Sequence, residues 1–426
     1  MAGNATKGRL VTVAVVAGSL LWTAPAGAQT AAELRQMIEL QRQQIEQQAR
    51  QLELLEQRLE ELDARTIDVE EPPAPTVLPP AVVAEEARVR SGDTGVSLAI
   101  SGQINRMVTV ANDGDDTKVF HVDNVNSSSR LRAVGRAEPT ERLAVGTLFE
   151  FEMRSNASTE VSQINEDTGV VGFRSRFVDI FFTHEDFGRL SVGRGSTASD
   201  GTSEIDLSGT SVIAYSSISD TAGGLLFFDD DLDQLSGTSI GNVFSNFDGL
   251  SRQNRLRYDT PTFAGFTASA DTVSDARWSA ALRWAGQTDV IRAGAAFGYS
   301  DPGDGRDWIV SSSASVLHQP TGLSFTFSAA GRDNPGRDDA LSLYGKLGWQ
   351  RDFFRFGRTH LAVDLARNDD VAVEVDEATS IGFSAVQNIT DFGIELFGLY
   401  RWHELDRNGA DFDDIHIVTL GTRVRF

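Results

Sequence analysis

Residues 96–109, VSLAISGQINRMVT, alternate apolar and polar side chains. The apolar members are Val96, Leu98, Ile100, Ile104 and Val108, and the polar members are Ser97, Ser101, Gln103, Asn105 and Thr109. A period of two residues predicts a β-strand with one apolar and one hydrophilic face. In a soluble sandwich the apolar face would form the core, whereas in a membrane barrel it would face lipid around a wet interior. The alternation alone leaves both folds open.

The connections between such strands favour the barrel. Short segments with turn residues alternate with long acidic or Gly/Ser-rich segments. The short ones are 138–140, 186–188, 260–262, 285–287, 319–321, 352–357 and 390–393, and the long ones include 301–306, 331–339, 368–377 and 404–414. Alternation of this kind puts turns at one end and loops at the other, as in outer-membrane barrels. Residues 91–426 therefore predict an all-β transmembrane barrel of about 16 antiparallel strands with an aqueous lumen.

The N-terminus predicts export. Lys7 and Arg9 precede an apolar run at 10–21, and small residues at 26–28 provide a cleavage site. This pattern predicts a secretory signal peptide over residues 1–28. The alternative is an N-terminal anchor that is retained.

Residues 29–65 predict a coiled-coil helix. Four apolar residues recur at every seventh position, namely Ile38, Ile45, Leu52 and Leu59. Such a heptad pattern predicts a helix that supercoils with copies of itself, although a lone amphipathic helix is the alternative. The following segment, 66–90, holds five of the eleven prolines and is expected to be an extended linker.

The composition excludes several classes of function. The formal net charge of −23 argues against binding to nucleic acid, whose phosphates need basic partners. The chain has no Cys, which removes disulfides and thiolate metal sites, and no cofactor or metal is predicted. Its six His form no arrangement typical of a catalytic triad, so an enzyme is not expected. A His within hydrogen-bond reach of a Ser or Asp in a cleft would reopen that possibility.

Three segments resemble the Gram-negative general porin family. Residues 255–266, RLRYDTPTFAGF, are similar to the family's strand-turn-strand segment after its constriction loop, and 186–194 resemble the segment before that loop. The last strand ends in Phe426, like the signal that the barrel-assembly machinery recognises. The N-terminal helix and linker resemble those of DcaP-type porins. The resemblance implies a homotrimer among outer-membrane lipids, with the coiled coil in the periplasm.

Residues 195–251 form the longest predicted connection, between the fifth and sixth strands. They contain no Lys or Arg and nine acids. In the family that this chain resembles, the loop at this place folds into the barrel and narrows it; an external flap is the alternative. The acids predicted at the constriction are Asp200, Glu204, Asp206 and Asp220.

Arginines at alternating strand positions are predicted to face these acids across the lumen. They are Arg130, Arg132, Arg176, Arg255 and Arg257. Opposed charges would set a transverse field across a pore, although the arginines could instead only pair with Glu150 and Glu152. The predicted function is passive diffusion of small hydrophilic solutes and ions, with a preference for cations. Alternatives are a channel specific for a sugar, a dicarboxylate or another small anion, and a barrel enzyme.

Overall fold

The computed structural model describes residues 87–91, 95–169 and 172–426. These residues belong to one compact unit, Leu78–Phe426. The expected signal peptide, the coiled-coil helix and the linker up to residue 86 lie outside the described residues and stay predictions. Within the described ranges, no helix is long and apolar enough to cross a membrane.

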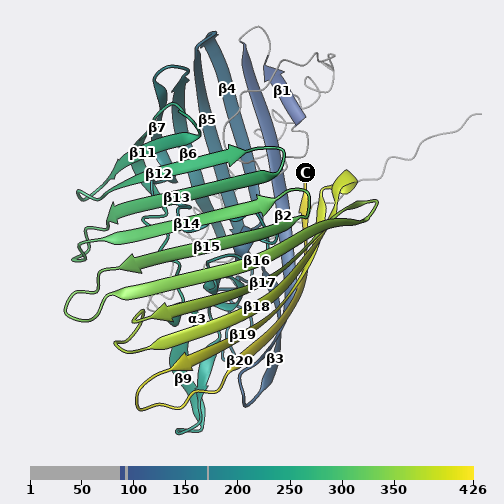
Figure 1. Ribbon diagram of the computed structural model, residues 1–426, viewed down its shortest axis with the longest axis vertical. Helices are drawn as coiled ribbons and strands as arrows, with labels where there is room; N and C mark the ends of the chain where they lie inside the picture. Colours follow the sequence, from purple (N-terminus) through teal and green to yellow (C-terminus); the bar gives the residue numbers. More distant parts are fainter. Residues whose placement is uncertain (1–86, 92–94, 170–171) are drawn as a thin grey trace, which may run out of the picture. The chain divides into compact units, whose positions relative to one another are not determined.

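The described strands form an antiparallel barrel whose first and last strands pair with each other (Figure 1). The wall consists of β2 (Val96–Asn112), β3 (Thr117–Asp123), β4 (Arg130–Thr140), β5 (Leu143–Arg154), β6 (Gly172–His184), β7 (Gly188–Ser196), β10 (Arg252–Asp259), β11 (Phe266–Val273), β12 (Trp278–Gln287), β13 (Ile291–Asp301), β14 (Ile309–His318), β15 (Leu323–Arg332), β16 (Ala340–Phe354), β17 (Gly357–Asp369), β18 (Glu377–Ile389), β19 (Ile394–Asp406) and β20 (Ile415–Arg425).

The predicted number of strands is confirmed. β3 and β4 pair with successive parts of β2, so they share one position in the wall. A short 3-10 helix, η2 (Val125–Ser127), separates them. β1 (Ala87–Ser91) pairs with the start of β2, on the edge that further along pairs with β20, so it adds no position to the ring. Among the described residues the ring therefore contains sixteen strands.

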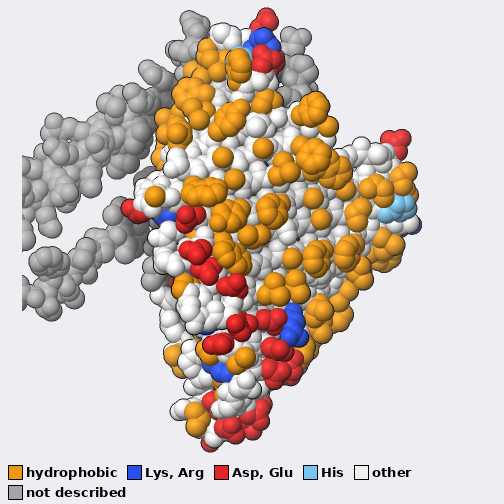
Figure 2. Space-filling view, turned by 60° about the vertical axis from the view of Figure 1, so that its left-hand side comes forward, with side chains coloured by type: hydrophobic (Ala, Val, Ile, Leu, Met, Phe, Trp, Pro, Cys, Tyr) orange, Lys and Arg blue, Asp and Glu red, His pale blue; other side chains and the backbone are white. Residues whose placement is uncertain are grey.

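The side chains of β2 explain why the barrel reading of the alternation is correct. Leu98, Ile100 and Val108 are exposed on the outside, whereas Asn105 and Thr109 are buried on the inside. Hydrophobic side chains likewise cover the outer face shown in Figure 2, and acidic side chains gather toward its lower end. An apolar exterior around a polar interior suits a wall between lipid and water.

The barrel closes where β20 meets β2. The Phe426 amide donates to the Gly102 carbonyl over 3.0 Å, and the Gly102 amide donates to the Phe426 carbonyl over 2.7 Å. A Cβ on Gly102 would lie 2.6 Å from the Phe426 ring. Glycine therefore leaves the space that the terminal ring occupies.

The connections differ in one respect from the predicted alternation of lengths. On the side opposite the seven turns, the connections at 113–116 and 274–277 are as short as turns. The antiparallel pairing of neighbouring strands, and not loop length, thus fixes which end each connection occupies. A short 3-10 helix, η3 (Thr390–Phe392), lies in the turn before β19.

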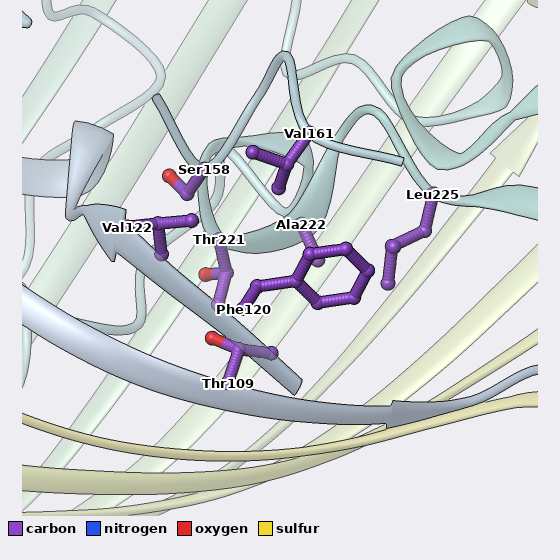
Figure 3. A pocket seen from close by; sticks show the side chains of 8 residues that line it. All are labelled: Thr109, Phe120, Val122, Ser158, Val161, Thr221, Ala222 and Leu225. Carbon is purple, nitrogen blue, oxygen red and sulfur yellow. The ribbon is translucent and has the colours of Figure 1, made fainter. Parts of the chain in front are cut away.

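Residues 197–251 join β7 to β10 and fold into the barrel. This constriction loop contains α2 (Ser219–Ala222), β8 (Leu226–Asp229), β9 (Gln234–Ser239) and α3 (Ile240–Val243). Many of its buried apolar side chains, including Leu225 and Phe227, belong to one cluster with Phe120 and Ile415 of the wall. Figure 3 shows Leu225 and Phe120 around a small gap of about 10 Å³ in this cluster. The loop is thus held by an apolar core of its own inside the lumen.

Candidate functional site

A cavity of about 580 Å³ lies between the constriction loop and the barrel wall. Its charged lining has two sides. The acids, all from the loop, are Asp200, Glu204, Asp220 and Asp248. The bases, all from wall strands, are Arg130, Arg154, Arg176, Arg252 and Arg423. Opposed charges therefore line a single hydrated space.

Two buried carboxylates orient the arginines of β4, β5 and β6. Glu150 lies 2.7 Å from Arg176 and 3.5 Å from Arg130. Glu152 pairs with Arg176 over 3.1 Å and also with Arg154. Both glutamates project inward from β5 and are almost completely buried. Because these buried glutamates hold the guanidinium groups in place, the arginines form an ordered array and are not free to move as surface side chains do.

Arg252 and Arg423 complete this array from the two sides. Arg252 lies 3.8 Å from Asp200, which is the nearest approach of a lining arginine to a loop acid among the ion pairs described. Arg423 pairs with Glu395 and donates to the hydroxyl of Ser127 over 2.6 Å. The arginine array therefore stays largely separate from the loop acids, with the cavity between them.

Burial favours the neutral forms of two loop acids, Glu204 and Asp248. Burial, together with the charges of Asp248 and Asp200, raises the pKa of Glu204 well above its ordinary value. Burial and the charge of Asp200 raise the pKa of Asp248 to about 6, although Asp248 accepts hydrogen bonds from the amides of Gly201 (2.6 Å) and Ser203 (3.1 Å). Both shifts weaken the tendency of these two carboxyl groups to carry negative charge.

The pKa of Asp220 is also raised. Burial raises its pKa, although the Tyr215 hydroxyl donates a hydrogen bond to its carboxylate. Both residues line the cavity.

Four of the residues predicted at the constriction lie outside the cavity lining. Arg132 pairs with Glu150 over 2.8 Å. Arg255 binds both oxygens of Asp179 over 2.8 and 2.9 Å, and it is buried. Arg257 pairs with Asp259 and donates to the carbonyl groups of residues 196 and 197. Asp206 pairs with Lys346 over 2.7 Å. The three arginines are thus held by neighbouring acids of the wall, and Asp206 is directed from the loop toward the wall.

Sequence reasoning missed four lining residues: Arg154, Arg252, Arg423 and Asp248. Arg423 had a usable signal, because Val418, Leu420 and Val424 alternate with it on β20. Arg154 and Arg252 end and begin their strands, where alternation no longer defines orientation. Asp248 lies far along the loop, so its return to the cavity depends on the fold of the loop.

A row of hydroxyl side chains holds the loop against β14. Ser311 lies 2.5 Å from the hydroxyl of Thr202, Ser313 accepts a hydrogen bond from the Ile205 amide, and Ser315 accepts one from the Leu207 amide. The next strands continue the contact, since Gln350 donates to the Leu207 carbonyl over 3.0 Å. The segment 202–210 thus crosses the inner wall strand by strand.

The histidines offer no catalytic arrangement among the described residues. His360 contacts the Ser208 carbonyl, His318 the Thr321 hydroxyl and His416 the Tyr400 hydroxyl. His184 lies 3.9 Å from Asp186 next to an exposed turn. None of them lines the cavity between the loop and the arginines.

A closed sixteen-stranded barrel with an apolar exterior, an inserted loop and a charged lumen defines a channel-forming membrane barrel. The chain belongs to the Gram-negative porin family, whose model matches residues 75–408. No curated protein matches the chain. The family assignment confirms the resemblance found in the sequence, and it makes the chain an outer-membrane channel for small solutes. The likeness to DcaP-type porins stays a prediction, because it rests on residues outside the described ranges.

Solved porin structures share the fold at low sequence identity. The anion-selective porin from Comamonas acidovorans is 16% identical, with 78% of this chain and 100% of that chain covered and a TM-score of 0.53. The trimer form of OmpT from Vibrio cholerae is 12% identical, with 78% and 100% covered and a TM-score of 0.50. These likenesses extend to the fold alone.

Proposed function

We propose that small hydrophilic solutes and ions diffuse passively through the space between the loop acids and the wall arginines. The observation that carries this proposal is the cavity of about 580 Å³, with carboxylates on one side and guanidinium groups on the other. Such a lining holds water and orients passing dipoles in a transverse field. Apolar solutes would have to displace that water without replacing its hydrogen bonds, so they are disfavoured.

The preference for cations predicted from the sequence is retained, but with a different origin. Burial raises the pKa of Glu204, which favours its neutral form, and Asp206 is paired with Lys346, so the cavity is less acidic than the loop sequence suggests. The outer connections are acidic: 404–414 has five acids and one arginine, and 301–307 has three acids and one arginine. Negative charge at a mouth raises the local concentration of cations. A modest cation preference that fades with salt is therefore expected.

The five lining arginines favour one alternative, a channel selective for small anions such as dicarboxylates. Guanidinium groups bind carboxylates in a bidentate manner. The Comamonas acidovorans porin with this fold is described as anion-selective, although its low identity transfers only the fold. The outer acids oppose this alternative. Among the described residues no histidine favours an enzyme, and we infer that the chain is a channel and not a barrel enzyme.

We also propose a homotrimer among outer-membrane lipids, with the coiled coil in the periplasm. Support comes from the trimer form of OmpT, which shares the fold, and from the heptad pattern at residues 29–65. Phe426, which closes the seam, is proposed to be the residue that the barrel-assembly machinery recognises.

The decisive test is recording of the purified protein in planar bilayers with a salt gradient across the membrane. Stepwise currents that are proportional to voltage, with a reversal potential of the cation-selective sign at low salt, are expected. A reversal potential of the opposite sign would favour the anion channel, and the absence of current steps would refute the proposed function.

A further inference from the structure

Lys346 is a fully buried lysine on the inner face of β16, beneath the constriction loop. Its ammonium group lies 2.7 Å from Asp206, 2.8 Å from the hydroxyl of Thr210 and 2.6 Å from the carbonyl oxygen of Ala214. The hydroxyl of Ser208 is 3.3 Å away. All four acceptors belong to the loop, whereas the lysine belongs to the wall. One side chain thus contacts four residues spread over the loop segment 206–214.

The loop carboxylate is held as firmly as the lysine. Asp206 also accepts a hydrogen bond from the Ser208 amide over 2.8 Å, and Thr326 of β15 lies 3.4 Å away. Burial alone would raise the pKa of Asp206, but the Lys346 ammonium beside it lowers the pKa below its ordinary value. The two groups form a buried ion pair, and removing one partner would leave the other buried without its counter-charge.

The segment 206–214 connects two parts of the cavity lining. Glu204 precedes it, and Ser211 and Val212 within it line the cavity together with Tyr215 just beyond. The other described contacts of the loop with β14 join neutral groups. Loss of one such neutral hydrogen bond costs less free energy than removal of one partner from a buried ion pair.

We propose that Lys346 is a positioning residue that locks the constriction loop against the wall and thereby fixes the width of the pore. This inference rests on the proposed channel function. The lock acts through Asp206, which explains why an acid of the predicted constriction lies outside the cavity. Loss of the lock should let the segment 206–214 move into or out of the lumen while the barrel stays closed.

The test compares Lys346→Met with wild type in planar bilayers at about 1 M salt, where the Debye length of ~3 Å suppresses effects of net charge. The variant should alternate between the wild-type conductance and at least one further level that wild type lacks. Lys118→Met is the matched control, because Lys118 lies at the partly exposed end of β3 and pairs with Glu166. It should conduct as wild type does.

A second variant distinguishes the loss of the Lys346–Asp206 contact from the effect of leaving Asp206 buried without a counter-charge. Lys346→Met combined with Asp206→Leu removes both charges, so the loop should be quieter than in Lys346→Met alone. Oligomer mobility on gels with and without heating checks that each barrel is folded. If Lys346→Met does not assemble, Asp206→Asn is recorded instead: it removes the loop charge through which the lock acts, while the three remaining acceptors of Lys346 favour folding.

The outcomes distinguish the two proposals. A wild-type protein without current would refute the channel function. A conducting wild type and a folded Lys346→Met (or Asp206→Asn) variant with identical single-level currents would overturn the lock.

Discussion

Lowering the pH from 7.5 to 5 should reduce the cation selectivity of the pore, and Asp248 should be the cause. With a pKa of about 6, this carboxyl is about 97% ionised at pH 7.5 and about 9% ionised at pH 5. Acidification therefore removes nearly one negative charge from the loop side of the cavity, while the opposing arginines keep theirs. The ratio of cation to anion permeability must fall as the pH falls.

The size of the effect follows from Coulomb's law. A unit charge about 4 Å from a passing ion in water is worth about 1 kcal/mol, and screening at 0.1 M salt reduces this to about 0.7 kcal/mol. The charge stabilises a cation and destabilises an anion by this energy, so each permeability changes about threefold and their ratio changes about tenfold. At 1 M salt the same charge is screened to about 0.3 kcal/mol, so the change in the ratio should shrink to about threefold.

The assay is the reversal potential across a salt gradient, measured at both pH values for wild type and for Asp248→Asn. The ratio should change less over this window in the variant than in wild type, although the variant retains all six histidines. Asp289→Asn, in the turn between β12 and β13, is the matched control and should behave as wild type. Equal pH dependence in wild type and Asp248→Asn, or a rise in cation selectivity on acidification, would refute the reasoning.

Three further changes test the barrel and its assembly. Arg255→Met leaves Asp179 buried without its bidentate partner and should cost about 3–5 kcal/mol; a lower temperature of unfolding on heated gels is expected, and an unchanged one would contradict the contact. Removal of Phe426 should reduce insertion into membranes while channels that do form conduct normally; normal insertion would exclude the proposed signal. Replacing Ile45 and Leu52 by Asp should weaken the oligomer on native gels by burying charge in the helical seam; an unaffected oligomer would assign the helix another role.

The parts of the structure that could be predicted from the sequence are those set by local periodicity. The alternation along β2 gives strand type and orientation, because lipid and water impose opposite requirements on neighbouring residues. Arg130 was predicted for the same reason and lines the cavity. Arg176 also lines it, although Asp179 interrupts the alternation of its strand. Strand parity therefore carries much of the information about the wall.

The remaining features of the site depend on tertiary contacts, which leave no periodic pattern in the sequence. The alternation of β10 predicts that Arg255 points into the barrel. It does not predict that Arg255 lies beneath the start of the loop and pairs there with Asp179. The loop acids looked equivalent in sequence, yet Asp206 meets Lys346 while Asp200 faces the cavity. Their roles are determined by how the loop folds on its apolar core, which involves residues far apart in the chain.

Cysteine accessibility measures most directly whether ions pass between the loop and the arginine wall. The chain has no Cys, so a single Ser211→Cys substitution gives one reactive site on the lining of the cavity. Addition of a charged thiol reagent during recording should reduce the single-channel current of this variant in a step. The same reagent should leave unchanged the current of Ser313→Cys, whose side chain is buried beneath the loop. An unaltered current after demonstrated modification of Ser211→Cys would contradict the proposed path.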